Sequence, residues 1–381
     1  MVYLDHNAIT PMRPEAKAAL VAALEVFGNP SSVHAAGRAA RDVLDRARAQ
    51  VATAIGSQPG EVVLTSGATE SAAIAIRGVL GAARPARDHL VVTAVEHPCV
   101  LAVAEALRAE GAPVTVLPVD RRGLPDMDAA NAAVTAKTAL VCAMLANNET
   151  GVVLPVRELA ALARDRGALF FTDAVQAVGK IPVDVRTLGA DLLALTGQKF
   201  GGPRGAGALW VKSGIRLAPL LGGTQERGRR AGTENLPGVA ALGAALAAAV
   251  EHREVEQRRI ATLRDRLEAR LVALVAGAAV NGAGAERLPG TLSITFPGAD
   301  AEALLIALDL EGICASAGSA CHSGAARPSP VLSAMGLTAA EARATLRLSL
   351  GWTSTGEDVE RALEAIPRLL RQVQAAIPAS G

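Results

Sequence analysis

Short apolar runs alternate with helical patterns along most of this 381-residue chain, and this alternation limits the possible folds more than any other feature. The runs are rich in Val and Leu, and helical stretches such as 69–80, 98–109 and 156–166 separate the earlier ones. Parallel strands that are buried on both faces have continuous hydrophobic runs, and helices connect them. The pattern therefore predicts an α/β fold with a mainly parallel, seven-stranded sheet covered on both faces. The expected strands are 61–66, 89–94, 114–118, 139–144, 168–172, 192–196 and 207–211.

The last third of the chain has a different rhythm. Strands are expected at 291–296 and 345–350, with helices at 301–310 and 357–372. A chain of this length is too long for one small core. We therefore expect a large domain over 15–245 and a smaller α+β domain over 246–381, with residues 1–14 packing on the smaller one.

Charge and cysteine usage exclude several classes of function. The formal net charge is +1, with basic and acidic residues interleaved, which argues against a nucleic-acid surface. No apolar run reaches membrane-spanning length, and the N-terminus has no leader pattern. The four cysteines include no C-x-x-C pair, so neither a disulfide framework nor a metal site is indicated. We expect a cytoplasmic protein that binds neither nucleic acid nor a membrane.

Two charged residues stand at the ends of apolar strands. Lys199 ends the run 191–199 and precedes a glycine-rich stretch, whereas Asp173 ends the run 170–173. A partly desolvated lysine loses its proton more easily, which suits Schiff-base chemistry. Pyridoxal phosphate needs such an amine for its aldehyde and a carboxylate for its pyridine nitrogen. The alternative is a salt bridge between two neighbouring strand ends.

A third strand end carries a glycine turn and a helix start, Thr65-Ser-Gly-Ala68-Thr69. The free backbone N–H groups at such a start, together with the Thr69 hydroxyl, form an anion site that suits a phosphate. Alone, the motif could be an ordinary helix cap. Because open α/β sheets bind ligands at the carboxyl edge, the three features together meet the needs of one cofactor.

Cys321 lies in a run of small residues, 316–324, which is typical of an exposed loop rather than a core. A thiolate can form in such a place, so we expect Cys321 to be reactive. The other three cysteines, Cys99, Cys142 and Cys314, lie near a helix start or within apolar strands and are expected to be packing residues.

Three further polar residues each allow two interpretations. Arg347 interrupts an apolar strand and either pairs with an internal acid or presents its donors to a substrate carboxylate. Asn148 follows a strand and either forms part of an Asn/Gly turn or orients a ring oxygen or a carboxylate. His97, between Glu96 and Pro98, is either a loop residue or a functional one.

Taken together, these motifs resemble the cysteine desulfurases of the NifS/IscS type, in the class V aminotransferase group of fold type I pyridoxal-phosphate enzymes. The resemblance covers nearly the whole chain. It runs through the motifs at 3–8, 28–34, 65–70, 96–98, 147–151, 173–180, 222–235, 318–321 and 328–329.

The resemblance implies a role for each matching residue. Lys199 would bind the cofactor aldehyde, Asp173 the pyridine nitrogen and Gln176 the phenolic oxygen, and His97 would stack on the ring and act in catalysis. Asn148 and Arg347 would hold the carboxylate of L-cysteine, and Cys321 would accept the sulfur. The residues expected around the phosphate are Ala68, Thr69, Thr196, Gln198 and, reaching across to the neighbouring subunit of a homodimer, Thr233.

The implied reaction takes sulfur from L-cysteine, releases L-alanine and leaves a persulfide on Cys321. The sulfur would pass to an acceptor such as an iron–sulfur cluster assembly protein, and Cys321 could be a transient iron–sulfur ligand. The chain departs from the usual Ser-x-His-Lys motif, because it has Thr196-Gly-Gln198-Lys199 instead. Both side chains can still donate to a phosphate.

Two other functions are considered. One is a related pyridoxal-phosphate enzyme without sulfur transfer, such as a small aminotransferase, and the loop cysteine Cys321 argues against it. The other is a non-catalytic scaffold that binds a sulfur-transfer partner. The intact set of Lys199, Asp173 and Cys321 argues against the scaffold.

Overall fold

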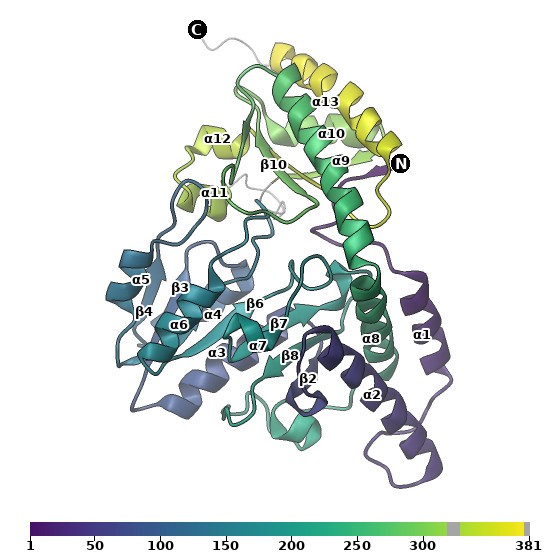
Figure 1. Cartoon of the computed structure of the whole chain (residues 1–381), viewed down its shortest axis with the longest axis vertical. Coiled ribbons are helices and arrows are strands. Elements are labelled where there is room, and N and C mark those ends of the chain that lie inside the picture. The colour runs from purple at the N-terminus through teal and green to yellow at the C-terminus, as the bar shows by residue number, and fades with distance from the viewer. Residues whose placement is uncertain (318–327, 377–381) are drawn as a thin grey trace.

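A computed structural model describes residues 1–317 and 328–376. Its centre is a seven-stranded sheet with the order β2-β8-β7-β6-β5-β3-β4 (Figure 1). Strand β8 runs antiparallel to both of its neighbours, and the other neighbouring pairs are parallel. The predicted mainly parallel sheet is confirmed. Its strands are β2 (Val62–Thr65), β3 (His89–Thr93), β4 (Val114–Leu117), β5 (Thr138–Cys142), β6 (Leu169–Asp173), β7 (Leu192–Thr196) and β8 (Gly207–Val211).

Helices cover both faces of this sheet because successive strand residues point to opposite sides. In β3, Val91 belongs to the cluster that includes α2, α6 and α8, whereas Leu90 and Val92 pack with α3 and α4. Both faces are apolar, so the strands have no polar side to expose. The helices of this part are α1 (Pro14–Leu24), α2 (Ala35–Ala54), α3 (Ala68–Ala83), α4 (Pro98–Ala109), α5 (Met127–Ala133), α6 (Val156–Asp165), α7 (Val185–Leu188) and α8 (Leu236–Glu251).

The C-terminal part has its own antiparallel sheet, in the order β12-β13-β10-β9. The helices of the C-terminal part lie in the upper half of the molecule in Figure 1, where α9 continues upward from α8. The strands of this part are β9 (Ala279–Val280), β10 (Thr291–Thr295), β11 (Ile313–Cys314), β12 (Ser316–Ala317) and β13 (Thr345–Ser349). Of these, β11 lies outside the four-stranded sheet. The helices are α9 (Arg253–Leu274), α10 (Ala301–Leu310), α11 (Pro330–Ala334), α12 (Ala339–Arg343) and α13 (Gly356–Ala376).

The N-terminal segment touches both parts. Strand β1 (Val2–Tyr3) pairs in parallel with β11 of the smaller part. Further along, the Thr10 N–H donates to the Gln198 carbonyl at 2.9 Å, and the Arg13 N–H to the Gly201 carbonyl at 2.9 Å. The segment therefore crosses the junction beside Lys199.

The two parts have separate hydrophobic cores, and a division at 245/246 stays a prediction. The core of the smaller part contains Val2, Leu4 and residues from Ile260 onward. The proposed boundary lies inside α8, and Val250 in the last turn of this helix still packs on the larger core. In the described ranges, no helix is long and apolar enough to cross a membrane.

Candidate active site

Lys199 is placed by a short 3-10 turn (Gly197–Lys199) directly after β7. Its Nζ donates to the carbonyl oxygens of Asn7 at 2.8 Å and Ala8 at 2.6 Å. Burial and the nearby Arg347 lower the pKa of Lys199 to about 8, although Asp173 acts in the opposite direction. The lysine thus bonds to backbone carbonyls rather than forming a salt bridge with Asp173, and about a tenth of it is neutral at pH 7.

Asp173 ends β6, and its Oδ1 accepts a hydrogen bond from the Val175 N–H at 2.9 Å. Burial raises the pKa of this carboxyl to about 6, against the opposing effects of that bond and of Lys199. A buried carboxylate of this kind is stabilised by a cationic partner. A protonated pyridine nitrogen fits this requirement.

His97 caps the start of α4, where its Nδ1 accepts the Cys99 N–H at 3.2 Å. The Cys99 Sγ lies 3.0 Å from the same nitrogen. Because Nδ1 faces donors, a neutral His97 carries its proton on Nε2. The pKa of His97 is lowered by burial and then by Lys199, so the ring is mainly neutral at pH 7. Burial raises the pKa of Cys99 to about 12, in agreement with the packing role predicted for this thiol.

The start of α3 is available to an anion. Gly67, at φ 155°, precedes the helix, and no side chain caps its first turn within the part of the chain that the structure describes. A Cβ built on Gly67 would lie 3.5 Å from the Thr196 hydroxyl, so Thr196 borders the same place. Glu70 in this turn would repel an anion, but Arg230 neutralises it through a 3.0 Å ion pair. The donors fit a phosphate group.

Gln176 follows β6 and lies next to the N-terminal segment. Its Nε2 donates to the Asn7 carbonyl at 2.9 Å, and its Oε1 accepts from the Lys180 ammonium at 2.7 Å. Both amide atoms are therefore fixed. Gln176 and Lys199 share the Asn7 carbonyl as acceptor, so the structure brings these two residues together.

Arg347 on β13 lies close to Asn148, although they are far apart in the sequence. Its Nη1 donates to the Asn148 carbonyl at 3.1 Å, and its Nη2 pairs with Asp5 at 2.8 Å. The internal acid considered from the sequence is thus present. Yet Arg347 Nε and Asn148 Oδ1 are both buried without a hydrogen-bond partner among the residues that the structure describes. Such unpaired polar atoms are costly, and a bound carboxylate would satisfy the arginine.

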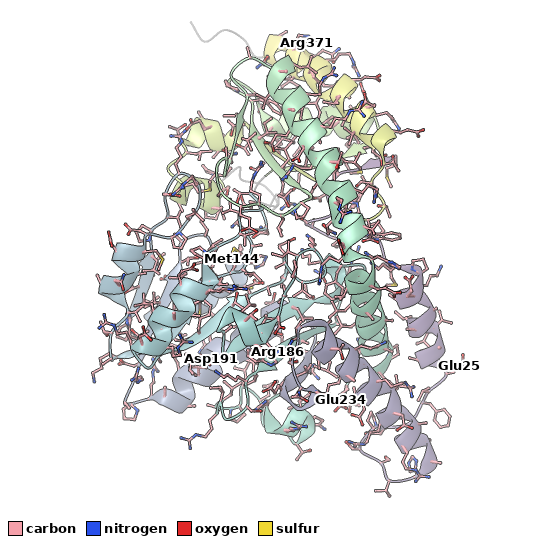
Figure 2. All side chains as sticks on the ribbon, in the orientation of Figure 1. Glu25, Met144, Arg186, Asp191, Glu234 and Arg371 are labelled. Carbon is pink, nitrogen blue, oxygen red and sulfur yellow. The ribbon has the colours of Figure 1, made fainter. Side chains whose placement is uncertain are left out.

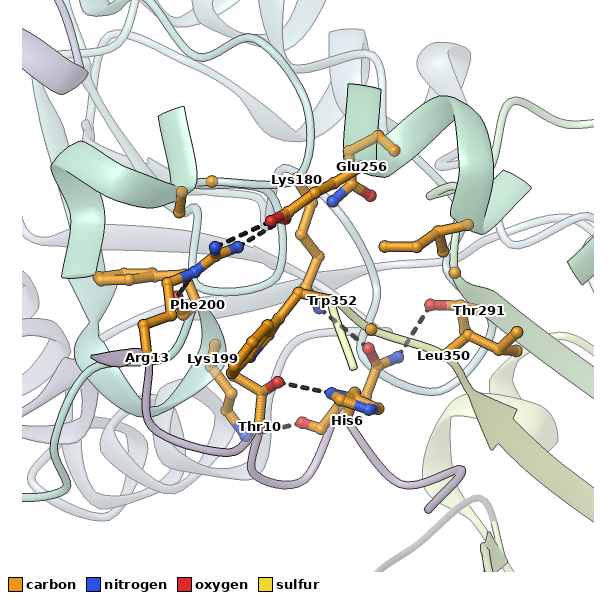
Figure 3. A pocket seen from close by; sticks show the side chains of 17 residues that line it. His6, Thr10, Arg13, Lys180, Lys199, Phe200, Glu256, Thr291, Leu350 and Trp352 are labelled. Carbon is orange, nitrogen blue, oxygen red and sulfur yellow. Dashed lines mark hydrogen bonds and ion pairs between the residues drawn. The ribbon is translucent and has the colours of Figure 1, made fainter. Parts of the chain in front are cut away.

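A small cavity of about 30 Å³ lies beside Lys199 (Figure 3). His6, Thr10 and Lys180 line it, together with Lys199 and Trp352. Met144, labelled near the middle of the molecule in Figure 2, follows β5 at the same carboxyl edge of the sheet and is buried. The site therefore forms where the strand ends, the N-terminal segment and the smaller part meet.

Not every expected residue joins this cluster. Thr233 is exposed in the loop before α8, and no hydrogen bond of its side chain is found in the described ranges. Gln198 is half-buried next to Lys199, and its backbone carbonyl, rather than its side chain, has a described bond. Cys321 lies outside the described residues. Among the described ones, no group of three or more His, Cys, Asp or Glu side chains forms a metal site.

Three residues of this cluster have no role predicted from the sequence. Asp5, Asn7 and Lys180 contact Arg347, Lys199 and Gln176, respectively. All three lie inside motifs that carried the family resemblance. Their positions were visible in the sequence, but their contacts were not.

The chain is similar to known proteins over nearly its whole length. Residues 2–362 match the aminotransferase class-V family. The chain is 44% identical over 380 residues to a protein from Trichormus azollae named cysteine desulfurase, covering 99% of this chain and 95% of that protein. It is 41% identical to a protein from Methanosarcina thermophila named cysteine desulfurase IscS, covering 98% and 93%. A solved structure described as a NifS-like protein superposes with a TM-score of 0.91 at 32% identity, covering 97% of this chain and 99% of that one.

Proposed function

This chain belongs to the aminotransferase class-V family and is a cysteine desulfurase, and from this premise we propose that it uses pyridoxal 5′-phosphate with Lys199, Asp173 and Cys321 as its central residues. The observation that carries the proposal is the meeting of a lysine of lowered pKa, a buried carboxyl and an uncapped helix start at one sheet edge. These groups match the aldehyde, the ring nitrogen and the phosphate of that cofactor.

The residues around the cofactor would divide into three groups. The start of α3 at Ala68 and Thr69, with Thr196 and Gln198, would bind the phosphate. Thr233 of a second copy would complete the phosphate site. Asp173 would hold the ring nitrogen, Gln176 the phenolic oxygen, and His97 would stack on the ring.

The chemistry then depends on where protons are held. When bound, pyridoxal phosphate supplies an aldehyde for amines and a ring that accepts electrons. Lys199, with its lowered pKa, is placed to take the α-proton of L-cysteine on Nζ and to return a proton. Arg347 and Asn148 would orient the substrate carboxylate, and the Nε2–H of His97 is available as a donor.

Cys321 would complete the reaction. Its thiolate attacks the substrate sulfur, so an S–S bond forms at Cys321 while the Cβ–S bond breaks. The electron pair of that bond goes to Cβ, which gains a proton, and the product is L-alanine. An ordinary thiol has a pKa near 8.5 and is only a few per cent ionised at pH 7, so a neighbouring base must take its proton.

The partners and location are part of the proposal. We infer a cytoplasmic homodimer that passes sulfur to an acceptor such as an iron–sulfur cluster assembly protein, with Cys321 as a transient iron–sulfur ligand. Support for a second copy comes from exposed apolar side chains in the segments near α1 and before η3 (Gln225–Gly228). Phe27 is 91% exposed, Val33 89% and Leu221 65%.

The experiment is to measure sulfide and alanine released from L-cysteine with a reductant, in the wild type and in Cys321→Ser. We expect the variant to lose release while keeping the absorption band of the bound cofactor, whereas Lys199→Ala loses both. Equal release by Cys321→Ser and the wild type would remove Cys321 from the mechanism. Sulfide released with pyruvate instead of alanine would favour a β-lyase, and no sulfide release by the wild type would favour an aminotransferase without sulfur transfer.

A further inference from the structure

Lys180 lines the cavity beside Lys199, and the proposed reaction gives it no role (Figure 3). Its ammonium donates to Gln176 Oε1 at 2.7 Å and to Asn7 Oδ1 at 3.0 Å. Both acceptors are neutral amides, so within the described part of the chain no carboxylate is bonded to this charge. Burial, and then the positive charges of Lys199 and Arg347, lower the pKa of Lys180 to about 7. Keeping a cation in this buried place costs free energy, which indicates that the lysine has a function.

The contacts of Lys180 determine which way the Gln176 amide faces. An ammonium has only donors, so the atom 2.7 Å from it must be the amide oxygen. The Asn7 carbonyl on the other side has only an acceptor, so the atom 2.9 Å from it must be the amide nitrogen. The two neighbours agree on one orientation. One Nε2 hydrogen then bonds to Asn7, and the other is available to a ligand.

We propose that Lys180 is a positioning residue, which holds the Gln176 amide so that its free N–H faces the phenolic oxygen of the cofactor. This inference rests on the proposed function, from which the role of Gln176 comes. Without Lys180 the amide can rotate and present its oxygen instead. An oxygen facing the phenolic oxygen repels its deprotonated form, whereas an N–H stabilises it.

Other charged side chains also lie around Lys180 and Gln176, and their effects on the titration must be distinguished from that of Lys180. They come from the N-terminal segment, the strand ends and helix α9. They are Asp5, His6 and Arg13, Asp173 and Lys199, Arg347, and Glu256. A direct effect of the Lys180 charge on the phenolic oxygen is the alternative, and a single substitution does not separate it from an effect that passes through Gln176.

The test is a pH titration of the absorption of the bound cofactor in wild type, Lys180→Met, Gln176→Ala and the double variant. We expect each single variant to lower the proton dissociation constant of the phenolic group by on the order of tenfold, since a hydrogen bond to a charged group is lost. The double variant should shift no further than Gln176→Ala alone, because Lys180 acts through Gln176. Lys180→Arg, also a donor, should restore most of the wild-type value.

Two controls keep the result interpretable. Lys212→Met removes an exposed lysine, which pairs with Asp191 at 3.2 Å, and should not shift the titration. If Lys180→Met does not fold, Gln176→Glu replaces it, because an ionised Glu keeps an acceptor for Lys180 but has no N–H. We expect Gln176→Glu to shift the titration in the same direction as Gln176→Ala.

Three results would overturn the inference. Lys180→Met could leave the dissociation constant unchanged while lowering stability, which would make the lysine purely structural. Gln176→Ala could cause no shift, so that the amide does not contact the phenolic oxygen. Lys180→Met could shift the titration as much in the Gln176→Ala background as in the wild type, which would indicate a direct charge effect. By contrast, a wild-type protein without any cofactor absorption would refute the proposed function itself.

Discussion

Asn7 is 3% exposed, and each of its polar atoms has a described partner. It therefore connects the N-terminal segment to both parts of the molecule. Its partners are Lys180 at Oδ1, Thr291 and Asn148 at Nδ2, Lys199 and Gln176 at the carbonyl, and Ser349 at the N–H. Since buried polar groups are stable only when they are paired, the side chain and backbone of this one residue fix the relative positions of several site residues.

His6 gives a prediction for pH. It is 1% exposed, and burial, followed by the charge of Lys180, lowers its pKa to about 4 from an ordinary 6.5, with Asp358 acting in the opposite direction. Between these values the unfolded chain binds the proton and the folded one does not, so stability falls as the pH falls from 6.5 towards 4. The loss between pH 7 and pH 5 is about 2 kcal/mol.

Denaturant unfolding of wild type and His6→Asn at pH 7 and pH 5 measures this loss. We expect the variant to lose about 2 kcal/mol less than the wild type between the two pH values. His252→Asn, at an exposed histidine just before α9, should behave like the wild type. Equal losses in the wild type and His6→Asn would mean that the buried ring is not the origin.

At the scale of elements, the start of α3, the proposed phosphate site, lies in close contact with β8. Gly207 begins β8, and a Cβ there would lie 2.7 Å from both Gly67 Cα and Leu195 O. These are backbone atoms, which cannot rotate away as a flexible side chain would. A side chain at position 207 must therefore move either the strand or the helix start.

Gly207→Ala is expected to destabilise the protein by about 1–3 kcal/mol, the usual cost of overpacking. Because the displaced atoms include the residue before α3, affinity for pyridoxal phosphate should also fall. Thermal unfolding without the cofactor and an absorption titration with it measure the two effects. Gly222→Ala, where a Cβ meets nothing within 4 Å, is the control. Unchanged affinity in Gly207→Ala would show that α3 does not rely on this contact.

At the scale of the whole molecule, an ion pair of Arg13 connects the N-terminal segment to α9. It forms two hydrogen bonds with Glu256, at 2.9 and 2.6 Å, and lies 5.2 Å from the centre of the Trp352 ring. The side chains of this pair are only 6% and 16% exposed. The charges are thus poorly hydrated and depend on one another.

Arg13→Gln should lower the free energy of unfolding by about 2–4 kcal/mol, because Glu256 is left partly buried without its partner. Arg258→Gln breaks a pair on the same helix whose side chains are 74% and 85% exposed, so its cost should stay within about 0.5 kcal/mol. Urea denaturation compares the two variants. Similar costs would argue that the Arg13 pair contributes no more than a surface pair.

Local sequence patterns predicted the longer elements and the type of chemistry. The expected strand at 192–196 and the expected helix at 301–310 agree with β7 and α10, because their signals are local apolar patterns. Lys199, Asp173 and the start of α3 could also be placed at strand ends from local patterns alone. The two-residue strands β1, β9, β11 and β12 had no such signal, since so few residues show no periodicity.

The tertiary structure alone decided which polar groups meet. Asp5 and Arg347 are 342 positions apart, and Lys199 and Asn7 are 192 positions apart, yet each pair is hydrogen-bonded. Local patterns contain no information about such distances, because the partner of a buried charge is set by the packing of whole elements. The lowered pKa of Lys199 and the orientation of Gln176 follow from that packing. Both properties arise only when the N-terminal segment packs against the edge of the sheet.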